Sequence, residues 1–174
     1  MMSTRLFSVL SVVVLAFLAV GCGPKMDPYK VTLTANDSIK DSSVAVHVIG
    51  INKNDFPLWD SYSMSKYWSP ADTLHKNPAV ATTILFDAKN LRTQAIAIDD
   101  AHWKMWRDYG ATHLFILANL PGFKEDRPGN ADARRQISAI DNLVYEDGFW
   151  GIKEVQLDVT HDGIRLCTPL KQKN

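Results

Sequence analysis

The feature that most constrains the fold of this chain is a series of short segments in which apolar and polar residues alternate. In residues 29–35, Val31, Leu33 and Ala35 alternate with polar neighbours, a period of two that is typical of a half-buried strand. Further strand-like segments lie at residues 44–51, 79–86, 92–98, 112–120, 134–143, 152–160 and 163–170. Residues 44–51 carry apolar side chains on both faces and are expected to be covered on both sides. About eight short strands at this spacing predict a mainly β fold, a two-sheet β-sandwich.

The order of these segments predicts part of the topology. Residues 112–120 carry apolar side chains on both parities, so we expect them to form a central strand that is buried on both faces. The turn residues at 87–90 are expected to close a hairpin between segments 79–86 and 92–98, and those at 161–162 to close a second hairpin.

Two short helices are expected beside the strands. Asp99 or Asp100 can cap a helix that ends near residue 109, in which His102, Trp106 and Tyr109 form an aromatic stripe at helical spacing. A second helix is expected to begin at the Ser-Pro pair 69–70 and to stop at the Asn-Pro pair 77–78.

The N-terminus has the layout of a secretory signal. One charge, Arg5, precedes an apolar run over residues 6–20 that ends directly before Cys22. Small residues immediately before a cysteine resemble a bacterial lipobox. The resemblance implies that residues 1–21 are a lipoprotein signal peptide and that Cys22 is lipidated, so that its acyl chains bind membrane lipid.

This interpretation divides the rest of the chain into two parts. Residues 22–28, with two prolines, are expected to form a lipidated tether, and residues 29–174 a single domain. The alternative is an ordinary secreted protein with a disulfide between Cys22 and Cys167. If Cys22 is lipidated, the apolar neighbours of Cys167 predict that it is a small buried hydrophobic residue.

The charge balance argues against nucleic acid as a partner. The chain has 19 Lys and Arg residues against 19 Asp and Glu residues, and removal of the signal peptide takes only Arg5. A nucleic-acid-binding protein needs a clustered basic face, and this composition does not indicate one.

No pattern in the sequence indicates catalysis, a metal site or a cofactor. The five histidines are not spaced as zinc ligands on a helix, and there is no Gly-x-Ser-x-Gly motif, calcium loop or phosphate-binding glycine run. The carboxylate pairs at 99–100 and 146–147 fall in expected turns, where capping or solvation explains them. His47 and His113 lie within expected strands and are interpreted as core or sheet residues.

An aromatic segment at residues 52–68 is the most unusual part of the domain. It fits neither the helix nor the strand period, so we expect a loop with a single helical turn. Its candidate surface residues are Trp59, Tyr62 and Trp68. They fit both a contact surface, since Trp and Tyr are enriched in interfaces, and a core between the sheets.

Four stretches together resemble one protein family. They are Val31–Ala35, Val44–Ile51, the aromatic segment from Asn54 to Trp68, and Gly110–Ala118. Their order is similar to that of the outer-membrane lipoproteins of the bacterial type VI secretion system, the TssJ family. The resemblance implies a transthyretin-like β-sandwich of about seven to eight strands with one or two short helices.

The resemblance also implies a function without catalysis. Such a protein is an adaptor in the outer membrane, lipid-anchored and facing the periplasm, where it holds the periplasmic domain of an inner-membrane secretion component. The contact is made chiefly by the loop between the first two strands. In this chain the corresponding partner-binding residues are Asn36, Asp37, Ser38, Ile39, Lys40 and Asp41.

Two other functions stay open at this stage. A lipoprotein that binds cell-wall glycan or peptide would expose Trp59, Trp68 or Trp150 on a flat or grooved face. A tethered hydrolase would need a pocket in which histidine and carboxylate groups converge.

Overall fold

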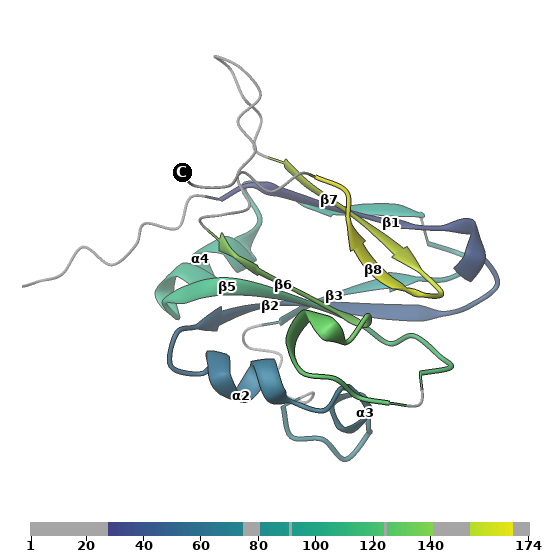
Figure 1. Cartoon of the computed structure of the whole chain (residues 1–174). Coiled ribbons are helices and arrows are strands. Elements are labelled where there is room, and N and C mark those ends of the chain that lie inside the picture. Colours follow the sequence, from purple (N-terminus) through teal and green to yellow (C-terminus); the bar gives the residue numbers. More distant parts are fainter. Residues whose placement is uncertain (1–27, 75–80, 91, 124, 141–153, 169–174) are drawn as a thin grey trace, which may run out of the picture.

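Two four-stranded sheets pack face to face in the computed structural model of the chain (Figure 1). The structure describes residues 28–74, 81–90, 92–123, 125–140 and 154–168. The expectations for residues 1–21, Cys22 and most of the tether, the Asn-Pro pair at 77–78, the carboxylate pair at 146–147 and Trp150 lie outside the described residues. None of the described helices is long and apolar enough to cross a bilayer.

The strands are short, as the alternating segments predicted. They are β1 (Lys30–Ala35), β2 (Val44–Asn52), β3 (Ala81–Phe86), β4 (Thr93–Ile96), β5 (Ala111–Ala118), β6 (Arg135–Ala139), β7 (Glu154–Thr160) and β8 (Gly163–Leu166). The helices are α2 (Phe56–Ser61), α3 (Met64–Tyr67) and α4 (Ala101–Asp108), with 3-10 turns η2 (Asp37–Ile39) and η4 (Gly129–Ala131). The prediction of a mainly β two-sheet sandwich is confirmed.

The strand order is β4-β1-β7-β8 in the first sheet and β3-β2-β5-β6 in the second. β5 is therefore central, as predicted, and β7 and β8 form the predicted antiparallel hairpin. β1 and β7 pair in parallel, a contact between distant segments that no local pattern indicated.

The hairpin expected between segments 79–86 and 92–98 is wrong. β3 pairs with β2 in the second sheet, whereas β4 pairs with β1 in the first. The residues between them carry the chain from one sheet to the other. Asp87 still forms the expected turn, because its carboxylate accepts hydrogen bonds from the amides of Lys89 and Asn90.

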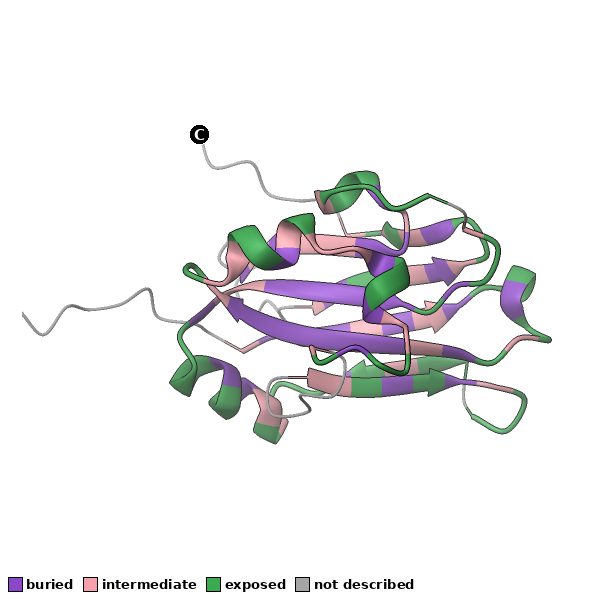
Figure 2. Ribbon diagram, turned by 90° about the horizontal axis from the view of Figure 1, so that it is seen from below, coloured by how far each residue is buried: buried purple, intermediate pink, exposed green. Residues whose placement is uncertain are grey.

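The main core lies between the two sheets, where the inner faces contribute side chains such as Leu33, Val46, Leu114 and Leu157. A second core lies on the outer face of the second sheet, beneath α2 and α3. Because both faces of this sheet are covered, β2 and β5 are buried over most of their length (Figure 2).

The aromatic segment forms the cover of this second core. It folds into two short helices, α2 and α3, rather than the single turn expected. Tyr67 is buried, and its hydroxyl hydrogen-bonds Nδ1 of the buried His47 at 2.6 Å. His47 is thus a core residue with a polar partner, as interpreted from the sequence.

Two further expectations are wrong in detail. No helix forms over the described residues 69–74, where the Asp72 amide donates to the Ser69 carbonyl in a turn. Cys167 is exposed rather than buried, because it directly follows the end of the edge strand β8.

α4 is capped by Asp100, which accepts a hydrogen bond from the amide of His102, as one of the two expected caps. Its buried face, however, is formed by Trp103 and Trp106. The expected stripe is correct for Trp106, but Tyr109 is exposed and His102 is only half-buried.

Candidate partner-binding surface

Four connections gather at one end of the sandwich. The registers bring the ends of β1, β3, β5 and β7 together with the starts of β2, β4, β6 and β8. The connecting segments at this end are residues 36–43, 87–92, 119–134 and 161–162. We call it the four-loop end, and it lies opposite the start of β1 (Figure 1).

The first of these loops contains the six predicted partner-binding residues. Asn36 caps the short helix η2 by accepting a hydrogen bond from the Ser38 amide at 3.0 Å. Ile39 turns inward and is buried, while the other five residues are exposed. Ile39 therefore holds the loop on the core.

Neighbouring loops fix the conformation of this loop. Arg92 donates to the Asp37 carboxylate at 2.6 Å and to the Asn36 carbonyl at 3.0 Å. The amide of His161 donates to the Ser38 hydroxyl at 3.0 Å. The candidate surface thus includes Arg92 and His161, which the sequence did not identify because their sheet assignments were needed first.

A cavity of about 160 Å³ opens between loops 36–43 and 87–92. Its lining includes the buried Ile39 and Phe86, together with Lys40, Asp87 and Arg92. The cavity is smaller than the about 300–1,000 Å³ of typical small-molecule sites. It has room for a single side chain.

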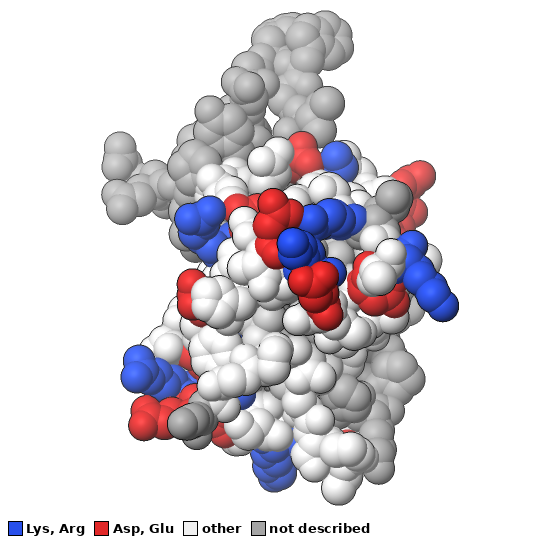
Figure 3. Space-filling view, turned by 90° about the vertical axis from the view of Figure 1, so that its right-hand side faces the viewer, with Lys and Arg blue, Asp and Glu red and all other residues white. Residues whose placement is uncertain are grey.

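Charges of both signs gather over part of this end of the molecule, and the rest of the face is largely uncharged (Figure 3). In loops 36–43, 87–92 and 161–162, the exposed charged residues are Asp37, Lys40, Asp41, Lys89, Arg92 and Asp162. A mixed surface favours a partner with a complementary pattern of charges over a uniformly charged polymer.

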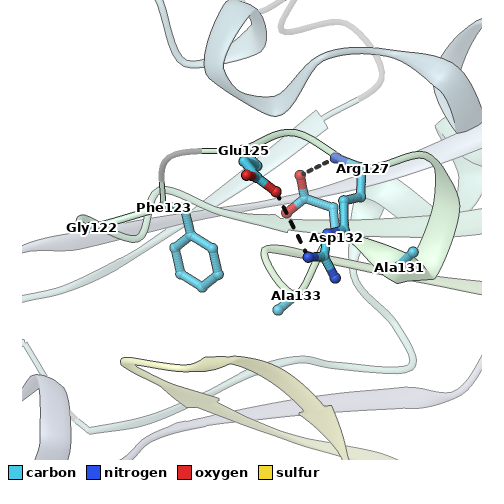
Figure 4. A pocket seen from close by; sticks show the side chains of 7 residues that line it. All are labelled: Gly122, Phe123, Glu125, Arg127, Ala131, Asp132 and Ala133. Atoms are coloured by element: carbon cyan, nitrogen blue, oxygen red, sulfur yellow. Dashed lines mark hydrogen bonds and ion pairs between the residues drawn. The ribbon is translucent and has the colours of Figure 1, made fainter.

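A larger cavity of about 420 Å³ lies along the loop between β5 and β6 (Figure 4). Phe123 lies on one side, and Glu125, Arg127 and Asp132 lie on the other. The Arg127 amide donates to the Asp132 carboxylate at 3.3 Å. Neither cavity has a histidine among its described lining residues, so neither has the convergence expected of a hydrolase.

A buried arginine network holds this loop on α3. Arg134 lies between Asp126 and Asp132, and its guanidinium donates to each carboxylate at 2.6 Å. Asp126 also accepts hydrogen bonds from the side chains of Ser63 and Ser65. Ser63 caps α3, so these contacts join the second core to the four-loop end.

The same network lowers the pKa of both carboxyl groups. Burial by itself raises the pKa of Asp126, but hydrogen bonds from Ser63, Arg134 and Ser65 outweigh it and hold that pKa well below its ordinary value. In Asp132, burial is likewise outweighed by the bonds from Arg134, and its pKa is lowered. Both groups are therefore charged in the folded protein at neutral pH.

This network predicts a loss of stability in acid. Because the folded-state pKa of Asp126 is below the unfolded value of about 3.9, its contribution is present above about pH 5 and is lost as the pH falls toward the folded pKa. Urea unfolding between about pH 6 and pH 2.5 should show a smaller pH dependence in Asp126→Asn than in wild type. Equal pH dependence in Asp126→Asn and wild type would contradict the assignment.

The candidate aromatic residues do not form one exposed face. Trp59 is only 7% exposed and packs on Phe115. The Tyr62 hydroxyl donates to the Asp72 carboxylate at 2.7 Å, and Trp68 packs against the His47 ring at 4.7 Å. These three residues mainly fill the second core, so of the two interpretations left open, the structure favours the core.

No group of three or more His, Cys, Asp or Glu side chains within the described ranges could hold a metal ion. His102 and His161 each lie beside a neighbouring aspartate, Asp100 and Asp162. The first pair belongs to the cap of α4, and the second lies on the exposed β7–β8 turn.

No protein-family model and no curated protein matches the sequence significantly. Solved structures do match the fold. A chain of a type VI membrane complex aligns with a TM-score of 0.50 and 13% identity, covering 83% of this chain and 100% of that chain.

Two more structures align less well. Serratia marcescens Lip, a membrane-bound component of the type VI secretion system, gives a TM-score of 0.48 and 10% identity over 82% of this chain and 98% of that chain. The T6SS lipoprotein TssJ1 from Pseudomonas aeruginosa gives a TM-score of 0.40 and 14% identity, and the alignment covers 84% of this chain and 99% of that chain. On the first of the three alignments, this chain has the β-sandwich fold of a protein found in a type VI membrane complex, which is the fold that the sequence resemblance implied.

Proposed function

We propose that this protein is a membrane-anchored periplasmic lipoprotein and a non-catalytic structural adaptor of a type VI secretion membrane complex. The observation that carries the proposal is the fold shared with a chain of such a complex over the full length of that chain. In this role the domain holds the periplasmic domain of an inner-membrane secretion component close to the outer membrane. It needs no cofactor.

The direction of β1 supports this arrangement. The strand starts at Lys30, close to the proposed tether, and ends at Ala35, where the partner-binding loop begins. A strand of this length spans about 20 Å. An anchor at Cys22 therefore keeps one end of the sandwich at the lipid and directs the four-loop end away from it, toward the periplasm.

The four-loop end supplies the proposed partner contact. Asn36, Asp37, Ser38, Lys40 and Asp41 are exposed on a loop that Arg92 and the buried Ile39 hold in place. A loop fixed in the free protein loses little conformational entropy on binding, which favours affinity. The cavity beside Ile39 adds a place where one side chain of the partner can be buried.

Co-purification from the native host tests this proposal. The wild-type chain with a C-terminal affinity tag is expected to retain an inner-membrane component of a type VI apparatus, identified by mass spectrometry. The double variant Lys40→Glu/Asp41→Lys reverses two exposed charges in the loop without changing net charge. This double variant should retain at least about tenfold less of the inner-membrane component than the wild-type chain does, because like charges brought together at an interface cost several kcal/mol.

A matched control is available at the opposite end of the molecule. Lys30 and Glu154 form an ion pair at 3.0 Å where β1 and β7 begin, and Lys30→Glu/Glu154→Lys makes the same kind of exchange there. This variant should retain the component at the wild-type level. Equal retention by both variants would remove the loop from the interface, and no retention by wild type would refute the adaptor role.

A further inference from the structure

Large apolar side chains are exposed mainly at the tethered end of the domain. Within the described ranges, five large hydrophobic residues are exposed: Leu58, Leu85, Ile98, Met105 and Tyr109. Ile98, Met105 and Tyr109 are 47%, 37% and 39% exposed, and all three belong to the single segment 97–110 that contains α4.

This segment packs directly against the start of the first sheet. The ring of Tyr29 lies 4.8 Å from the ring of Trp103, and Trp103 donates its indole N–H to the Ala97 carbonyl at 2.8 Å. Trp103 and Trp106 form the buried face of α4, so Met105 lies on its solvent side. Figure 1 shows α4 beside the start of β1, at the end opposite the four loops.

The tether is short enough to keep this segment near the bilayer. From Cys22 to Pro28 there are seven residues, which reach at most about 25 Å even when fully extended. An acyl anchor at Cys22 therefore holds Tyr29, and with it α4, within that distance of the lipid. A weak contact suffices there, because tethering makes the second contact intramolecular and raises its effective concentration.

The chemistry of the segment fits a lipid headgroup region better than a protein partner. Lys104 is exposed in an ion pair with Asp108, and Arg107, also exposed on α4, forms no salt bridge within the described part of the chain. Aliphatic and tyrosine side chains beside cations are typical of helices that lie at a membrane surface. Three apolar side chains are too few for a stable protein interface, which uses about 20–30 residues on each side.

We propose that segment 97–110 is a membrane-contact surface. Ile98, Met105 and Tyr109 enter the headgroup region of the leaflet that carries the acylated Cys22. The contact fixes the orientation of the tethered domain and directs the four-loop end away from the membrane. This inference rests on the lipid anchor of the proposed function.

Fluorescence quenching on vesicles tests this contact with an artificial anchor. The chain from residue 22 onward, with Cys22→Ser, Cys167→Ser and a hexahistidine sequence in front of residue 22, is bound to phosphatidylethanolamine–phosphatidylglycerol vesicles containing nickel-chelating lipid. A single cysteine at Ile98→Cys or Met105→Cys carries an environment-sensitive fluorophore, and Leu85→Cys, an equally exposed apolar position in β3, is the matched control.

A nitroxide on the lipid headgroup should quench the fluorophore at positions 98 and 105 at least about threefold more strongly than at position 85, because interfacial residues sit at headgroup depth. Equal quenching at all three positions would overturn the proposal. So would a spectral shift at position 105 that depends on protein concentration without vesicles, since it would indicate that a second copy covers the segment.

The two proposals can fail separately. The histidine anchor replaces the acyl chains, so the quenching result does not depend on lipidation in the cell. Labelled palmitate is expected to enter the wild-type chain but not Cys22→Ser. Equal uptake, or none, would refute the anchor at Cys22 whatever the vesicle experiment shows.

Discussion

Replacing Arg135 by methionine is expected to lower the free energy of unfolding by about 4 kcal/mol. Arg135 is 2% exposed. Its guanidinium donates to four backbone carbonyls: Gly129 at 3.0 Å, Trp59 at 2.7 Å, Tyr62 at 3.1 Å and Arg127 at 2.6 Å.

The size of the effect follows from what the substitution leaves behind. Methionine fills most of the volume but donates no hydrogen bond. The carbonyls of Tyr62 and Arg127 lose the Arg135 donor, whereas those of Trp59 and Gly129 each keep a backbone donor. Each carbonyl left without a donor costs about 1–3 kcal/mol, and local relaxation recovers part of the total. The carbonyls belong to α2 with its C-terminal cap and to the β5–β6 loop, so the loss should loosen the cover of the second core.

Urea unfolding followed by circular dichroism measures this change. Arg165→Met is the matched control, because Arg165 is exposed and contacts only Asp158 among the described carboxylates, at 3.1 Å. An exposed ion pair contributes about 0–1 kcal/mol. If Arg135→Met proved no more destabilising than Arg165→Met, Arg135 would not be what holds the β5–β6 loop to α2 and its C-terminal cap.

Substitution of Gly50 by alanine is expected to destabilise the fold by about 3 kcal/mol, the upper range for overpacking a core. A Cβ atom at position 50 would lie 2.5 Å from Cγ and 2.6 Å from Cδ1 of Trp106. Trp106 is fully buried between α4 and the sheet, so it cannot move away without displacing its neighbours. Gly50 thus lets the helix approach β2 closely.

A double-mutant cycle isolates this contact. Trp106→Ala alone should cost about 3–5 kcal/mol through loss of buried area and the cavity left behind. In the Trp106→Ala background, the added cost of Gly50→Ala should fall clearly below its cost in wild type, because the two nearest indole atoms are gone and only Cβ of residue 106, at 2.9 Å, still meets the new methyl group. An unchanged cost in that background would mean that steric overlap with Trp106 is not the reason for glycine at this position.

The proposed functions depend on the two ends of the sandwich having different chemistry. The tethered end presents Ile98, Met105 and Tyr109 on one segment, and the four-loop end presents mixed charges around a small cavity. An adaptor between a membrane and a protein partner needs this division. Neither end requires a reaction to be carried out.

Local patterns in the sequence were sufficient for the elements themselves. Period-two alternation placed strands such as β1 and β7 within a few residues, because a strand with one buried face must alternate. Apolar residues on both parities identified β5 as central, since only a strand covered on both faces tolerates them. The cap at Asp100 was also predictable, because capping depends on neighbours in the chain.

Contacts between distant segments were decided only by the tertiary structure. The turn residues at 87–90 give the same sequence signal whether the two flanking strands pair with each other or belong to different sheets. Only the pairing of β4 with β1 and of β3 with β2 shows that the chain crosses between sheets here. The parallel pairing of β1 with β7, more than a hundred residues apart, had no local signal at all.

The same limit applies to the sites. The residues around Cys22 identified it as a candidate, whereas the loop at 36–41 became a candidate only through the family resemblance. The contribution of Arg92 and His161 to that loop, the burial of Trp59 and the place of α4 beside Tyr29 followed only from packing. The physical reason is that burial and hydrogen bonding depend on which faces meet in space, and residue order alone does not specify that.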